Sequence, residues 1–121
     1  MAAPATLICV GHAALDRIYR IDSFPPEPTK IRALEHIETG GGMAANAAVA
    51  AARLGAEVEL WSRVGDDQAG VAIRNGLKSE KVEVRYVHAF EEARSSTSAV
   101  IVDGQGERMI ITQRDTSIPA G

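Results

Sequence analysis

The chain has 121 residues, of which 45% are apolar and 24% charged, so it has the size and composition of one globular domain or part of one, not of a disordered or fibrous protein. Its 13 basic and 16 acidic residues give a net charge of -3, which offers no electrostatic basis for binding nucleic acid. The amino terminus lacks a basic segment followed by a long apolar stretch, and Cys9 is the single cysteine. We therefore expect a cytoplasmic protein with no membrane span and no internal disulfide.

The first third of the chain combines one apolar run with two more polar ones. Thr6–Val10 ends at Gly11 and is typical of a central strand that is buried on both faces of a parallel sheet, with Cys9 packed in the core. Residues 17–22 and 30–38 are separated by a proline-rich stretch and predict strands of a sheet with one apolar face.

The middle of the chain has the order strand, helix, strand, helix. Residues 44–54 are strong helix formers that stop at Gly55, a residue suited to the position just after a helix. Residues 58–64 predict a second core strand, which the helix joins to the first in a right-handed crossover. Asp66 or Asp67 is suited to cap a further helix that runs to about Glu80.

The last third predicts a β-hairpin. Residues 96–103 and 107–112 are β-prone, and they are joined by Gly104-Gln105-Gly106, which tolerates the positive φ angles of tight turns. Two kinds of sheet therefore result, one of buried strands tied by helices and one of amphipathic strands. Because two buried parallel strands leave wide edges uncovered, we expect further strands after Gly121.

Two places have residues suited to a polar ligand. Gly40, Gly41 and Gly42 run directly into the predicted helix, where a ligand can approach the backbone closely and Asn46 can donate to and accept from a hydroxyl; a tight turn before a closely packed helix explains the glycines equally well. Asp16 follows the first strand near its carboxyl end, where open α/β sheets bind ligands, although a solvated loop acid fits the same position.

Other candidate sites are weaker. Arg108, beside the hairpin turn, can reach a phosphate or a sugar, but edge cations of this kind are commonly only solvated. The G-x-G-x-x-G turn of dinucleotide-binding domains is missing after the first strand. The three histidines have no metal-ligand spacing, so no metal site is expected from them: His12, His36 and His88.

The stretch GGMAANAAVAAARLGAEVELWSRVG, residues 41–65, resembles the first signature of the PfkB, or ribokinase-like, carbohydrate kinases, and the segments ICVGHAALDRIYRIDSFP, GDDQAG and GERMII are also similar to that family. The resemblance implies an α/β fold, with the amino-terminal part of a ribokinase-like doubly wound sheet and a small β-sheet lid. The lid would comprise residues 17–22, 30–38, 96–103 and 107–112, and in this family it often pairs with a second subunit in a homodimer. The implied activity is phosphorylation of a sugar hydroxyl, with ATP and Mg²⁺.

The resemblance also implies roles for individual residues. Asp16 and Asn46 would bind sugar hydroxyls, while Gly41 and Gly42 would let the sugar lie against the helix start. The catalytic Asp base and the ATP-binding part of the family have no counterpart in these residues and would lie beyond Gly121, so we expect the chain alone to be inactive. If the protein naturally ends at Gly121, the alternative is a non-catalytic sugar-binding or dimerisation module.

The resemblance also bears on the substrate. Met43 stands where the ribokinase pattern has a lysine, which puts ribose in doubt. The chain looks most similar to ketohexose kinases and bacterial sulfofructose kinases, so a furanose ketose is the first expectation. Lys30 and Arg32, expected on the strand that enters the lid, would pair with an anionic substituent if the sugar carries one, or would simply be solvated.

Overall fold

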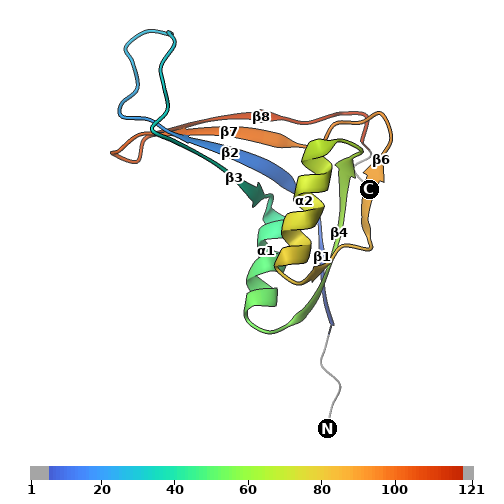
Figure 1. Cartoon of the computed structure of the whole chain (residues 1–121). Helices are drawn as coiled ribbons and strands as arrows, with labels where there is room; N and C mark the ends of the chain where they lie inside the picture. The colour runs from blue at the N-terminus through green and yellow to red at the C-terminus, as the bar shows by residue number, and fades with distance from the viewer. Residues whose placement is uncertain (1–5, 119–121) are drawn as a thin grey trace.

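The computed structural model describes residues 6–118, which form two four-stranded sheets and two helices (Figure 1). In the first sheet, β1 (Thr6–Val10) pairs with β4 (Glu57–Gly65), and two short strands, β5 (Val82–Glu83) and β6 (Val87–Phe90), follow one another along the other edge of β4. All of these pairings are parallel. The second sheet has the order β3 (Glu35–Gly41), β2 (Ala14–Arg20), β7 (Thr97–Val102), β8 (Arg108–Gln113), with a parallel pair, β2 and β7, in its centre.

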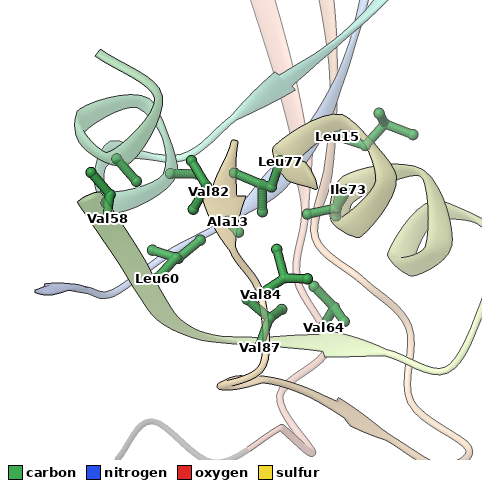
Figure 2. Packing of buried hydrophobic residues seen from close by; sticks show 12 residues of the cluster. Ala13, Leu15, Val58, Leu60, Val64, Ile73, Leu77, Val82, Val84 and Val87 are labelled. Carbon is green, nitrogen blue, oxygen red and sulfur yellow. The ribbon is translucent and has the colours of Figure 1, made fainter. Parts of the chain in front are cut away.

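Helices α1 (Met43–Arg53) and α2 (Gln68–Ser79) lie side by side against the first sheet, and the second sheet projects away from them (Figure 1). The core lies between these helices and β4 (Figure 2). Alternate residues of β4, Val58, Leu60 and Val64, are at most 4% exposed, as expected for a strand with one face covered by helices. Ala48 of α1 is fully buried, and its small side chain lets the helix lie close to the sheet.

Local signals placed the helices and the hairpin correctly. Helix α1 ends at Arg53. After the C-cap residue, Leu54, Gly55 has φ +97°, as predicted for a glycine after a helix. Asp67 caps α2 by accepting a hydrogen bond from the Gly70 amide at 2.8 Å. The turn between β7 and β8 contains Gly106 at φ +86°.

The predicted strand over residues 30–38 is wrong in its first part. The strand that pairs with β2 begins only at Glu35, which is level with Arg20, and the Leu34 amide donates to the Arg20 oxygen at 2.7 Å. Lys30 and Arg32 therefore lie in the loop between the two strands. The alternation of apolar and polar residues there is also compatible with an irregular loop after a proline-rich stretch. Conversely, β2 begins at Ala14, before the predicted residue 17, because Ala14 and Leu15 are buried and paired with β3.

The prediction that Thr6–Val10 is a central strand buried on both faces is wrong for the described residues. β1 pairs with β4 alone among residues 6–118, and Val10 is 70% exposed. Cys9 points to the covered side and packs against the core, as predicted. An apolar run indicates a strand suited to burial, but it does not specify what covers each face.

Strands β5 and β6 were not predicted. Arg74 of α2 holds the break between them by donating hydrogen bonds to the carbonyl oxygens of Val84, at 3.1 Å, and of Val87. Val82, Val84 and Val87 are at most 3% exposed, so the two short strands and the break between them complete the core beside β4.

Candidate functional site

The start of α1 is packed against the segment that leaves β1. Gly42, the residue before the helix, has φ +95°, and a Cβ atom there would lie 2.4 Å from the His12 carbonyl oxygen and 2.8 Å from the Ala13 Cα. The Ala45 amide donates to the same His12 oxygen at 3.3 Å. Glycine is therefore required at position 42 by the backbone itself, whether or not a ligand approaches.

Asp16 lies directly over Gly41. A Cβ atom on Gly41 would be 2.4 Å from Asp16 Oδ2 and 2.7 Å from Oδ1, so the carboxylate occupies the space that the missing side chain leaves. β2 and β3 place the two residues diagonally, since Asp16 pairs with Thr39 and Ala14 pairs with Gly41. The structure thus brings two of the predicted site residues into contact. The half-buried Asp16 carboxylate lies against Gly41, which is one residue before Gly42, the N-cap of α1.

Asp16 is also part of a row of polar residues across the second sheet. Residues that pair across neighbouring strands share a face of the sheet, so the residues that pair in turn with Asp16 across the strands lie in a row beside it. The polar row, as we call it, consists of Thr39, Asp16, Ser98 and Thr112. The apolar row lies two residues away along each strand and consists of Ile37, Ile18, Val100 and Ile110. A polar strip beside an apolar strip suits a ligand that has both hydroxyl groups and C–H faces.

Asn46 lies in the first turn of α1. It is exposed, and its backbone N–H donates to the Gly42 carbonyl oxygen at 2.9 Å. It lines a pocket of about 560 Å³ between α1, α2 and the end of β3, together with Gly41 and Leu15. Asp16 is not among the residues that line this pocket. Asn46 and Gly41 therefore line this pocket, and Asp16 lies against Gly41.

The structure does not bring Lys30 or Arg108 to Asp16. Arg108 pairs with Val102, four residues along β7 from Ser98, the partner of Asp16, which corresponds to about 13 Å. The loop that contains Lys30 leaves β2 at the same distant end of the second sheet, far from the helices (Figure 1).

Three residues near Asp16 carry positive charge or can acquire it, and sequence reasoning missed their proximity. The pKa of the His12 imidazole is lowered from its ordinary value by burial first and then by the charges of Arg114 and Arg63, while Asp16 acts in the opposite direction. The three residues come from three separate segments, so only the folded chain brings them near Asp16.

Within residues 6–118, no three His, Cys, Asp or Glu side chains are grouped closely enough to hold a metal ion. Neither helix of this part of the chain has the length and apolarity needed to cross a membrane.

Residues 4–118 match the sequence model of the pfkB family of carbohydrate kinases. It is 35% identical to a ribokinase from Bacillus subtilis over 105 residues, which cover 86% of this chain and 36% of that protein. It is 42% identical to a fructokinase from Klebsiella pneumoniae over 72 residues, which cover 60% of this chain and 24% of that protein.

Among solved structures, the fold is similar to that of the Arabidopsis thaliana ribokinase complexed with ribose and ATP, with a TM-score of 0.81, 26% identity, and coverage of 98% of this chain and 39% of that one. The chain thus spans about a third of the length of the ribokinases it matches. The predicted α/β, ribokinase-like fold class is confirmed by this likeness. The family match over nearly the whole sequence shows that the chain belongs to the pfkB family of carbohydrate kinases.

Proposed function

We propose that the full-length protein containing this chain transfers a phosphoryl group from ATP to a hydroxyl group of a sugar that is bound at Asp16. The observation that carries the proposal is the Asp16 carboxylate lying over Gly41 at the start of α1. A carboxylate held in this way can accept hydrogen bonds from two neighbouring hydroxyl groups, and the absence of a side chain at Gly41 leaves the space that the carboxylate occupies. The ribose and ATP bound to the Arabidopsis relative support the assignment.

The residues of this chain would bind and orient the sugar. The polar row offers further hydroxyl groups beside Asp16, from Ser98 and Thr112, and the apolar row offers Ile18 and Val100 to the C–H face of the sugar. Asn46, on the other side of Gly41, offers an amide as donor and acceptor. ATP, Mg²⁺ and the Asp base that deprotonates the acceptor hydroxyl would be held outside the described residues, and positioning would supply much of the rate acceleration.

The second sheet would act as the lid over the bound sugar. Ile37 and Ile110 on its Asp16 face are 47% and 53% exposed, so this face has apolar surface available for a sugar, for the rest of the enzyme or for a second subunit. A homodimer formed through this sheet is part of the proposal. We also propose a cytoplasmic location, on the basis of the single unpaired cysteine.

A furanose ketose is the proposed substrate class. Relatives named ribokinase and fructokinase both match the chain, so the similarity alone does not choose between them. Met43, 87% exposed at the first position of α1, replaces the lysine of the ribokinase pattern and removes a cation from the helix start. The idea that Lys30 and Arg32 bind an anionic substituent loses its support, because both lie in the distant loop.

The proposal is tested by measuring sugar-dependent ADP formation by the full-length protein with ketohexoses, ribose and adenosine as acceptors. We expect kcat/KM for ketohexoses to exceed that for ribose and adenosine, and we expect no turnover by the 121-residue chain alone. A clear preference for nucleosides would defeat the substrate class. Sugar binding by the full-length protein without ADP formation from any acceptor would instead support a non-catalytic module, and turnover by the isolated chain would show that no further residues are needed.

A further inference from the structure

The second sheet, which carries Asp16, is joined to the first sheet and its helices by short connections. Within residues 6–118 there are three of them: residues 11–13, Gly42 and residues 91–96. The third connection runs from β6 to β7 and passes the end of β4. No space is left there, because a Cβ atom on Gly65 would lie 2.3 Å from the Ala93 oxygen and 2.6 Å from the Ser95 nitrogen. The end of β4 therefore fixes the position of this connection.

Ser95 is the residue that bonds the connection to the core. It is 3% exposed, and its hydroxyl group accepts a hydrogen bond from the Gly65 amide at 2.9 Å. The Ser95 hydroxyl and amide groups donate to the two carboxylate oxygens of Asp67 at 2.7 and 2.9 Å. Hydrogen bonds to a carboxylate are stronger than those between neutral groups, and attachment at two points fixes orientation as well as position.

The residue after Ser95 passes this fixed position on to β2. The Ser96 carbonyl oxygen accepts a hydrogen bond from the Leu15 amide at 3.0 Å, and Leu15 directly precedes Asp16. Leu15 is 5% exposed, so this bond is shielded from water. An unbroken series of hydrogen bonds and peptide bonds therefore leads from the Asp67 carboxylate, through Ser95, to the backbone of Asp16.

We propose that Asp67 and Ser95, which we name the anchor pair, are positioning residues for the sugar site and act by fixing Asp16 relative to the first sheet. The inference rests on the proposed function, in which Asp16 binds the sugar and ATP is held outside the described residues. A displacement of the second sheet would then move the sugar away from ATP, and a misplacement of about 1 Å costs up to about 100-fold in rate. The binding of ATP itself would not change.

Hydrogen exchange of the Leu15 amide, followed by NMR in the full-length protein, tests the anchor pair without relying on catalysis. Ser95→Ala removes both hydrogen bonds of the hydroxyl group and keeps the bond from Gly70 to Asp67 that caps α2. We expect exchange of the Leu15 amide to accelerate about tenfold more than exchange of the Leu60 amide in β4. A global loss of stability would accelerate both amides equally.

Asp103→Asn is the matched control. Asp103 is a buried carboxylate of the second sheet that also accepts hydrogen bonds from two amides, at 2.9 and 3.0 Å, but both donors lie in its own hairpin. It is five residues along the chain from the partner of Asp16, which corresponds to about 16 Å. Asp103→Asn should not separate the exchange of Leu15 from that of Leu60. Equal acceleration of the two amides in Ser95→Ala would overturn the proposal.

Steady-state kinetics with fructose as the acceptor test whether the anchor pair acts through Asp16. Ser95→Ala and Asp67→Asn should each raise KM for fructose about tenfold and leave KM for ATP unchanged. In an Asp16→Ala background, Ser95→Ala should lower kcat/KM for fructose by less than about twofold, because residues that act as a unit are not additive. An equal fall in both backgrounds, or a lower kcat with unchanged KM for fructose, would show a purely structural role and contradict the proposal.

The two measurements separate a failure of this inference from a failure of the proposed function. A wild-type protein that phosphorylates no sugar would contradict the proposed function, and the exchange of the Leu15 amide would then decide whether the anchor pair fixes Asp16. Circular dichroism shows whether each variant is folded. If Ser95→Ala does not fold, Ser95→Cys takes its place, because a thiol forms weaker hydrogen bonds from the same position.

Discussion

The two adjacent glycines before α1 have different physical roles. Gly42 has φ +95° and lies against the backbone of residues 12 and 13, so it is required by the packing of the helix start. Gly41 has no positive φ, and the space above it holds the Asp16 carboxylate. The sequence shows three glycines in a row and cannot separate these roles, because the distinction depends on the pairing of β2 with β3.

Alanine substitutions should separate the two glycines. In Gly41→Ala the new methyl group would displace the Asp16 carboxylate, so we expect kcat/KM for the sugar to fall about tenfold or more in the full-length protein while Tm changes little. In Gly42→Ala the strained φ and the backbone contact should lower the free energy of unfolding by about 1–3 kcal/mol. Thermal unfolding and sugar kinetics, measured on both variants, give the comparison.

Gly40→Ala is the control for this pair, because a Cβ atom on Gly40 would have no atom within 4 Å. It should leave both Tm and sugar kinetics near those of the wild type. Wild-type sugar kinetics in Gly41→Ala would show that the position of the Asp16 carboxylate does not matter for catalysis.

At the scale of elements, Asp67 connects three parts of the chain. Its carboxylate accepts hydrogen bonds from the Gly70 amide at 2.8 Å and from the amide and hydroxyl groups of Ser95 at 2.9 and 2.7 Å. Ser95 Oγ in turn accepts a hydrogen bond from the Gly65 amide at 2.9 Å. The end of β4, the start of α2 and the segment that enters β7 are thereby fixed to one another, which holds the second sheet relative to the first.

This network predicts a pH dependence of stability. Burial acts to raise the pKa of Asp67, but the hydrogen bonds from Ser95 and Gly70 outweigh it and hold the pKa below its ordinary value. A carboxyl group with a lowered folded-state pKa contributes stability that is fully present above its unfolded pKa, of about 3.9, and that is lost as the pH falls through the folded value. Below about pH 4, wild type should therefore lose stability more steeply than Asp67→Asn.

Urea unfolding from neutral pH to about pH 2.5 measures this difference, with Asp66→Asn as the control, because the Asp66 side chain is exposed. Asp66→Asn should follow the wild-type curve. Parallel pH curves for wild type and Asp67→Asn would show that Asp67 does not supply the acid-sensitive stability.

Element ends that local signals mark were predicted from the sequence, and those that depend on distant pairing were not. Gly55 and Asp67 mark helix ends through their own backbone or side chain, and the turn glycines do the same for the β7–β8 hairpin. The start of β2 was missed because Ala14 becomes a strand residue only when Gly41 pairs with it. Likewise, Ser98 becomes a candidate only once its pairing with Asp16 is known.

At the scale of the whole molecule, the described residues cover one face of the first sheet. Both helices pack on the side of Leu60, while the opposite side exposes apolar residues of β1 and β4 and of the β5–β6 connection, namely Ile8, Val10, Trp61 and Tyr86. A doubly wound sheet has helices on both faces. The second helical layer is not formed by residues 6–118. We expect it to come from the remainder of the full-length protein, because the relatives are about three times as long as this chain.

The central claim is that Asp16 binds the sugar, and kcat/KM for the sugar in full-length Asp16→Ala tests it most directly. The substitution removes hydrogen bonds to substrate hydroxyl groups that are worth about 1–3 kcal/mol, so kcat/KM should fall by roughly 5- to 150-fold. Asp22→Ala, which changes an exposed acid in the loop after β2, should behave as wild type. Sugar kinetics in Asp16→Ala that match those of wild type and of Asp22→Ala would contradict the account.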